Sequence, residues 1–120
     1  MASTGTKTTR IAAAGLPACP VETSLAVIGK KWKVLILREL RRGPLHFGEL
    51  KANIDGVSQK MLTANLREMA DDGLVTRTAY PEVPPRVIYE LTGLGESLSP
   101  VLDALAEWGE GYQALRAGRG

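Results

Sequence analysis

The stretch GVSQKMLTANLREMADDG, residues 56–73, decides the fold, and it predicts a helix with two unlike faces. Ser58 stands where its hydroxyl can accept from a backbone N–H of the first turn, and the final Asp-Asp-Gly supplies a stop. Apolar side chains recur at three- and four-residue spacing, so one face must pack on the rest of the domain. The residues of that face are Leu62, Leu66, Met69 and Ala70.

The opposite face of this helix is small, polar and basic in its first turns. At about 100° per residue it carries Lys60, Ala64 and Arg67, flanked by Gln59 and Thr63. The acids Glu68, Asp71 and Asp72 follow at the C-terminal end. This charge order opposes the helix dipole, which favours acids first. It suits a helix whose N-terminal half enters a DNA major groove. An ordinary amphipathic surface helix with solvated charges is the alternative, and the helix alone leaves both open.

Composition and charge narrow the function classes. The chain has 120 residues, enough for one domain, and no apolar run approaches the roughly 20 residues that span a membrane. Its net charge of +2 divides into +6 for residues 1–60 and −4 for residues 61–120, which favours a polyanion on one side. The single cysteine excludes an internal disulfide and fits a reducing cytoplasm. No zinc cluster, phosphate loop or catalytic triad is present, so we expect no metal, no cofactor and no enzyme activity.

Upstream of this stretch the chain predicts further helices. Residues 1–16 are rich in Ala, Ser, Thr and Gly, and we expect a disordered tail there, followed by one domain over residues 17–117. A short helix begins near Pro20 and ends at Gly29, and residues 30–42 form a central buried helix. We interpret Lys30, Lys31 and Lys33 as its solvated flank. A short helix over residues 47–53 and a turn over residues 54–57 complete a helix-turn-helix.

Downstream, two strands and a long helix follow. Residues 74–80 and 86–91 alternate in the β manner and are joined by a proline loop. Directly after a helix-turn-helix such a hairpin makes a wing, although an unrelated surface hairpin is the alternative. From Thr92 onward a helix carries apolar residues in a seven-residue repeat, which indicates a partner surface or packing back on its own core. We expect Pro100 to bend or interrupt the first part of this helix. That repeat is Leu94, Leu98, Val101, Leu105, Trp108, Tyr112 and Leu115.

These segments together resemble the HxlR family of bacterial winged-helix transcription regulators. The likeness covers roughly residues 17–112 and is carried by strings along the whole ordered chain. They are Cys19-Pro20-Val21, GKKW at 29–32, ILREL at 36–40, FGEL at 47–50, residues 54–67, DGLV at 72–75, YPEVPPRV at 80–87, YELT at 89–92 and Trp108-Gly109.

The resemblance implies a mainly α (α+β) winged helix-turn-helix with a two-stranded wing and extra terminal helices that form a homodimer. Its interface would use Val21, Leu25, Leu98, Val101, Leu105, Trp108 and Tyr112. The resemblance also implies that a cysteine just before the first helix can sense oxidants or electrophiles, and Cys19 stands at that place. His46 departs from the family, since many relatives have a basic residue before the Phe.

The expected function is a cytoplasmic, nucleoid-associated regulator, a repressor that binds an inverted-repeat operator in double-stranded DNA as a homodimer. Candidate DNA contacts are Ser58, Gln59, Lys60, Thr63, Asn65, Arg67, Arg77, Arg86, Lys51 and His46. Asn65 lies toward the apolar side of its helix. The alternative function is a winged helix used for protein interaction without DNA, against which the basic exposed face argues.

Cys19 is the candidate for an effector site. A lone cysteine in a small protein is more often a packed, inert thiol than a sensor. Here the thiol stands beside Pro20 at the mouth of a helix, where the dipole favours a thiolate. Without a second cysteine, oxidation ends as an intersubunit disulfide, a mixed disulfide with a small thiol, or an over-oxidised acid.

Overall fold

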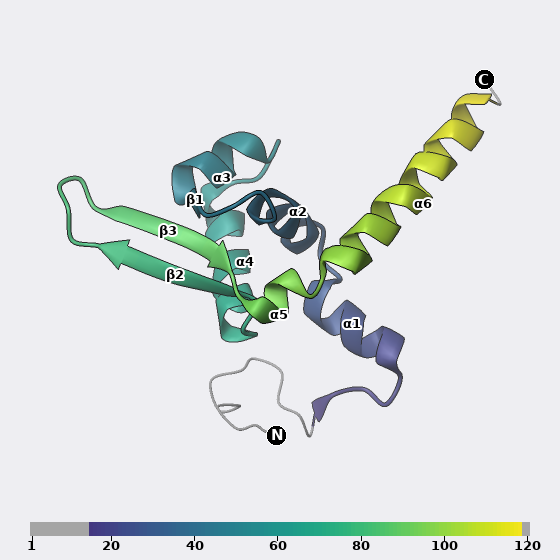
Figure 1. Cartoon of the computed structure of the whole chain (residues 1–120), viewed down its shortest axis with the longest axis horizontal. Coiled ribbons are helices and arrows are strands. Elements are labelled where there is room, and N and C mark those ends of the chain that lie inside the picture. The colour runs from purple at the N-terminus through teal and green to yellow at the C-terminus, as the bar shows by residue number, and fades with distance from the viewer. Residues whose placement is uncertain (1–14, 119–120) are drawn as a thin grey trace.

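The computed structural model describes residues 15–118, and it is a helix-rich chain with a small antiparallel sheet that extends to one side (Figure 1). The expected disordered tail over residues 1–16 lies almost wholly outside the described residues. In chain order the elements are α1 (Pro20–Ile28), α2 (Lys31–Leu40), β1 (Leu45–His46), α3 (Phe47–Asn53), α4 (Gln59–Asp71), β2 (Val75–Tyr80), β3 (Arg86–Leu91), α5 (Gly93–Glu96) and α6 (Ser99–Gly118).

The core forms where α2, α3 and α4 meet. Ile36 and Leu37 of α2, Leu50 of α3, and Leu62 and Met69 of α4 are all completely buried in one apolar cluster. The 3.6-residue period of α4 therefore buries Leu62, Leu66 and Met69 of the expected apolar face, whereas Ala70 is exposed, and the predicted helix-turn-helix is confirmed.

Both ends of α4 are closed as the sequence predicts. Ser58 Oγ accepts a hydrogen bond from Met61 N at 3.1 Å. At the other end Gly73 has φ of 83°, a left-handed conformation that favours glycine. The amide of Gly73 donates to Ala70 O at 3.0 Å and that of Leu74 to Met69 O at 2.9 Å, the paired bonds of a Schellman motif. The helix thus has a defined length, and the chain turns directly into β2.

The sheet has the strand order β1-β3-β2, with antiparallel pairing throughout. Val75 lies opposite Leu91 and Tyr80 opposite Arg86, so β2 and β3 form the predicted hairpin around the proline loop. Thr92 ties the base of this hairpin to the end of α4: its hydroxyl donates to Gly73 O at 2.6 Å and accepts from Gly95 N at 3.0 Å. The wing is therefore held in place beside α4.

The terminal helix is interrupted in its first part, which is one of the two effects expected of Pro100, but the break comes before the proline. The heptad repeat from Leu94 to Leu115 spans two helices, because α5 ends at Glu96 and α6 starts at Ser99. Pro100 stands in the first turn of α6, where a missing N–H costs no hydrogen bond, and it does not bend the helix. Leu98, in the break, is half-buried against the protein's own core, and its place in a dimer interface stays a prediction.

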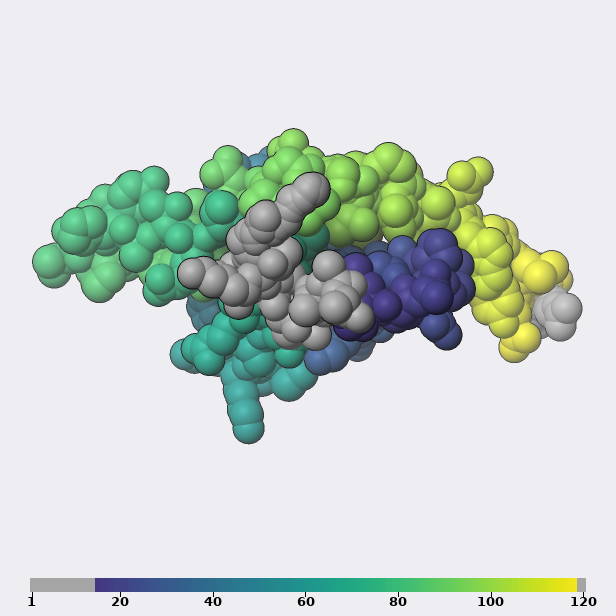
Figure 2. Space-filling view, turned by 90° about the horizontal axis from the view of Figure 1, so that it is seen from below, coloured from purple at the N-terminus to yellow at the C-terminus, as the bar shows by residue number. Residues whose placement is uncertain are grey.

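Helix α6 projects away from the rest of the molecule (Figure 1). Figure 2 shows the hairpin and the C-terminal end of α6 at opposite ends of an elongated body. An ion pair holds the base of α6 to the end of α2, with 2.9 Å between Arg41 Nη2 and Asp103 Oδ1. Beyond its buried Leu102, most of α6 is exposed.

A second departure concerns Lys33, which the sequence analysis placed in a solvated flank of α2. Its side chain is only 1% exposed, and its Nζ lies 2.6 Å from Glu68 Oε1 on α4. Lys30 approaches the same oxygen at 3.4 Å and is well exposed. A lysine is almost never fully buried unless it is paired, and the acid that pairs Lys33 comes from another helix.

The close approach of α5 to the chain before β2 gives a stability prediction. A Cβ on Gly95 would overlap the carbonyl oxygen of Leu74, whereas a Cβ on Gly93 would meet nothing within 4 Å. We expect Gly95→Ala to lower the free energy of unfolding by about 1–3 kcal/mol, the usual cost of overpacking, and Gly93→Ala to change it by less than about 0.5 kcal/mol. Urea denaturation of both variants measures this; equal stability would contradict the packing described for α5.

Candidate nucleic-acid interface

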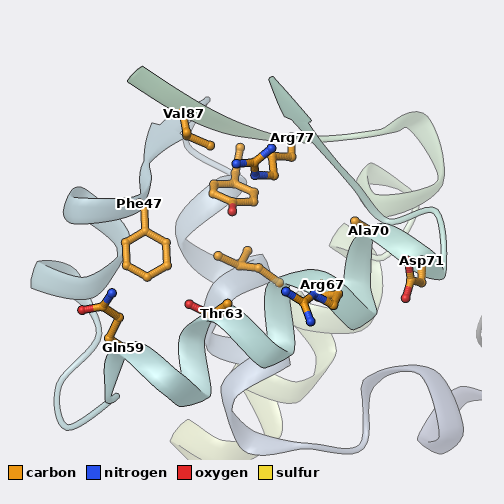
Figure 3. A pocket seen from close by; sticks show the side chains of 10 residues that line it. Phe47, Gln59, Thr63, Arg67, Ala70, Asp71, Arg77 and Val87 are labelled. Carbon is orange, nitrogen blue, oxygen red and sulfur yellow. The ribbon is translucent and has the colours of Figure 1, made fainter. Parts of the chain in front are cut away.

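A hollow of about 550 Å³ opens between α4 and the sheet (Figure 3). Gln59, Thr63 and Arg67 lie along its α4 side, and Arg77 and Val87 lie on its sheet side. The helix brings Gln59, Thr63 and Arg67 to one side because they are spaced by four residues. The other lining residues are Phe47, Leu66, Ala70, Asp71 and Tyr89. The hollow thus combines an apolar floor with polar and basic walls.

A second, shallower surface continues around α4. It is lined by Gln59, Lys60, Thr63, Ala64 and Arg67. All five side chains are exposed, and they come from the first two and a half turns of the helix. The exposed face of α4 therefore offers hydrogen-bond donors and two positive charges over a continuous surface.

The positive charges of the molecule divide into paired and unpaired ones. Within residues 15–118, the cations that form no ion pair are Lys31, Lys51, Lys60, Arg67, Arg77 and Arg116. Half of these, Lys60, Arg67 and Arg77, lie on the face formed by α4 and β2. The arginines of α2 and its C-terminal end are instead neutralised by Glu39 or Asp103. Uncompensated charge is therefore concentrated where the polar side chains of α4 are exposed.

The tip of the wing is organised by Arg86. Its guanidinium carbon lies 4.4 Å from the centre of the Tyr80 ring, and its Nη2 lies 3.0 Å from Glu82 Oε2. These contacts hold both ends of the proline loop together. His46 and Arg86 line a further hollow of about 450 Å³ between the start of α3 and this loop. The His46 side chain approaches Glu49 Oε1 at 3.1 Å.

Seven of the ten sequence-predicted contact residues line the hollows, and the other three, Ser58, Lys51 and Asn65, do not. Gln59, Lys60, Thr63, Arg67 and Arg77 surround the hollows beside α4, and His46 and Arg86 lie toward the wing tip. Ser58 is exposed and already accepts the capping bond of α4. Lys51 is exposed on α3 and lines none of the hollows described above.

Asn65 must be removed from the contact residues. Its side chain is only 4% exposed, and its Nδ2 donates to Met61 O at 2.7 Å within α4. Within the described part of the chain, its Oδ1 has no hydrogen-bond partner. The side chain points into the body rather than toward the exposed face, because it stands beside Met69 and Leu62 on the helix wheel. Asn65 does not reach a ligand bound outside α4.

The floor of the main hollow was missed by the sequence analysis. Phe47 comes from the start of α3, and Val87 and Tyr89 come from β3. The alternation in β3 could have indicated that Val87 and Tyr89 lie on the same side, since residues two apart on a strand share a face. The sequence gives no such indication for Phe47, because its position beside α4 depends on the turn between α3 and α4.

Cys19 stands at the start of α1 and lines none of these hollows. It is the N-cap residue of α1, and its thiol is exposed and free. Residues 15–118 contain no group of three or more His, Cys, Asp or Glu side chains arranged to hold a metal ion. Over the same range, no helix has both the length and the apolar character needed to cross a bilayer.

Known proteins share this architecture. The family described as HxlR-like helix-turn-helix matches residues 27–116. An uncharacterized HTH-type transcriptional regulator of Methanothermobacter thermautotrophicus is 51% identical over 94 residues, which are 78% of this chain and 72% of that protein. The HTH-type regulator YkvN of Bacillus subtilis is 50% identical over 96 residues, 80% of each chain. The redox regulator HypR in its reduced form has a TM-score of 0.78 and 39% identity, covering 83% of this chain and 99% of that one.

The fold and the polar, basic face of α4 define a winged helix-turn-helix protein, the class of transcription regulators to which these relatives belong. More narrowly, the chain belongs to the HxlR-like helix-turn-helix family, and the family expected from the sequence is confirmed.

Proposed function

We propose that the chain is a homodimeric repressor that binds an inverted-repeat operator through α4 and the wing. The observation that carries the proposal is the placement of the unpaired cations Lys60, Arg67 and Arg77 around the exposed polar face of α4. Phosphate attraction supplies a large share of the affinity of a DNA-binding protein, and it is strongest from cations that no protein carboxylate already neutralises.

Within this proposal the residues divide by role. Lys60, Arg67 and Arg77 contact phosphates, while Gln59 and Thr63, at the N-terminal half of α4, face the base edges of a major groove. The acids of α4 lie at its C-terminal end, where they stay clear of the DNA backbone. Arg86, His46 and Lys51 meet the flanking backbone, and Ser58 fixes the start of α4. The regulator would act in the cytoplasm, on the nucleoid.

The dimer is proposed from exposed apolar side chains on the terminal helices. Val21 and Leu25 of α1 are 66% and 60% exposed, and Trp108 of α6 is 70% exposed. Trp108 and Tyr112 stack with ring centres 5.2 Å apart, which makes a flat aromatic surface. Val101, Leu105 and Leu115 extend it along α6. A monomer seldom leaves so many large apolar side chains in water, and a second copy covers them with twofold symmetry.

The regulatory part of the proposal rests on Cys19. The thiol is exposed at the N-terminus of α1, next to the proposed dimer surface. The redox regulator HypR, to which this chain is similar over 83% of its length, gives the idea further support. Two Cys19 thiols of a dimer would lose two protons and two electrons to an oxidant and form one intersubunit disulfide, which favours one dimer geometry over another.

Selection from a random-sequence duplex library by the purified protein tests the proposed function. Two recognition helices related by a dyad reach major grooves about one helical turn, roughly 34–36 Å, apart. Enriched duplexes should therefore hold two inverted half-sites with that spacing or a multiple of it. A library that shows no enrichment, or enrichment of single half-sites, would contradict the proposal.

The first prediction from this proposed function concerns the salt dependence of binding to the selected duplex. Each phosphate neutralised contributes about −0.9 to the slope of log affinity against log salt. Lys60→Ala should make that slope shallower by about one unit per protomer and weaken selected and scrambled duplexes alike. Arg116→Ala removes the same charge near the end of α6 and serves as the control. Equal slopes for both variants, measured by fluorescence anisotropy, would remove Lys60 from the interface.

The second prediction concerns assembly. Sedimentation equilibrium at micromolar concentration should give about twice 12.9 kDa. Trp108→Ala should weaken dimerisation by about 2 kcal/mol or more, because truncation of a central aromatic side chain has that cost at an interface. Glu110→Ala, also exposed on α6, is the matched control. A wild type that stays monomeric throughout would exclude the dimer.

The third prediction concerns redox control. Diamide treatment of the wild type should change its affinity for the selected duplex by about tenfold, in the usual range of coupling between two sites. Cys19→Ser should be insensitive to the reagent. Mass spectrometry of the treated protein identifies the disulfide or adduct. If the thiol is modified and affinity stays the same, Cys19 is not a switch.

A further inference from the structure

The buried ion pair between α2 and α4 is not explained by DNA contact or by dimer formation. Lys33 is almost fully buried, and its Nζ lies 2.6 Å from Glu68 Oε1. Glu68 retains 30% exposure and is also approached by Lys30 at 3.4 Å. Both lysines belong to the start of α2, and Glu68 lies in the second half of α4, so the contact joins two helices.

The contact between α2 and α4 could be buried without a charged pair. Removing the Lys33 ammonium from water carries a desolvation penalty, and apolar residues of similar volume often stabilise a core as well or better. The apolar face of α4 already supplies Leu62, Leu66 and Met69 to the core. This packing selects which face of α4 is buried, although the hydrophobic effect itself has no preferred direction. A short ion pair has a preferred distance and direction, and it therefore restricts the remaining small rotations and shifts of α4 against α2.

Glu68 directly follows Arg67, so its position depends on the same rotation of α4 that presents Arg67, Thr63 and Gln59 to the outside. The two lysines also compensate a carboxylate on the one helix that must approach a polyanion. The rotation of α4 and the compensation of the Glu68 charge both affect the exposed face of α4 more than they affect the free energy of folding.

We infer that Lys33 and Glu68 are positioning residues for DNA recognition: their pairing fixes the rotation and register of α4, and with it the discrimination between DNA sequences. This inference rests on the proposed DNA-binding function. Neither side chain touches DNA; each acts through the orientation of Gln59, Thr63 and Arg67.

The test uses the full-length protein, the duplex selected by the wild type, and a scrambled duplex of equal length. Lys33→Met and Glu68→Gln each break the pair while keeping the side-chain volume close to the original. They change the net charge in opposite directions. A general electrostatic effect would therefore weaken binding in one variant and strengthen it in the other. A positioning effect lowers the ratio of selected to scrambled affinity in both. Lys31→Met removes the same charge from an exposed neighbour of α2 and is the control.

We expect the ratio to fall about tenfold in Lys33→Met and in Glu68→Gln, comparable to the loss of one good base contact, and to stay unchanged in Lys31→Met. Circular dichroism and thermal melting report whether each variant is folded. The double variant Lys33→Met/Glu68→Met should recover the melting temperature of the wild type without recovering the ratio, which separates orientation from stability.

Unchanged ratios in folded single variants would overturn the inference. Recovery of the ratio together with stability in the double variant would do the same, since it assigns the pair to folding alone. If both single variants and the double variant unfold, the pair is structural and the inference is also lost. A wild type that selects no duplex contradicts the proposed function itself, whereas a wild type that discriminates and variants that match it contradict only the role of the pair.

Discussion

The packing of α4 on α2 is the interaction on which the rest of the structure depends. A 13-residue helix is marginal in water, so α4 exists because its apolar face is buried in the domain core. The rotation that buries Leu62 and Met69 is the rotation that exposes Lys60 and Arg67. Folding and the presentation of a polar, basic face are therefore one event, since they follow from the same helical period.

The position of the wing also depends on α4, because a short turn and a hydrogen bond connect the hairpin to the end of this helix. Gly73 ends α4 in a left-handed conformation, and β2 starts two residues later. Thr92, at the other end of the hairpin, donates to the carbonyl of Gly73. These connections place the sheet beside α4, and the hollow lies between the two. Arg67 and Arg77 face it from opposite sides, and Asp71 is the one acid in its lining.

Local signals explain how much of this was predictable from the sequence. The Ser58 cap, the Asp72-Gly73 stop and the alternating strands around the proline loop each act within a few residues, and all three are confirmed. What failed depended on contacts between distant segments. Lys33 looked solvated, because nothing near it in the sequence reveals that Glu68 of α4 would meet it.

In the candidate site, Asn65 was included among the DNA contacts although the helical period already placed it toward the apolar side of α4, and the structure buries it there. The seven-residue repeat continued through Leu98, but the chain bends there so that Leu98 packs on the core. The aromatic floor made by Phe47 and Tyr89 required the relative placement of α3, α4 and β3.

The claim that α4 enters a major groove is tested most directly by methylation interference on the selected duplex. Dimethyl sulfate modifies guanine N7, which lies in the major groove, and adenine N3, which lies in the minor groove. The account predicts interference at guanine N7 in two half-sites whose centres are about 10–10.5 base pairs, or a multiple of that, apart. Interference restricted to adenine N3, or none at guanine N7 in either half-site, would contradict it.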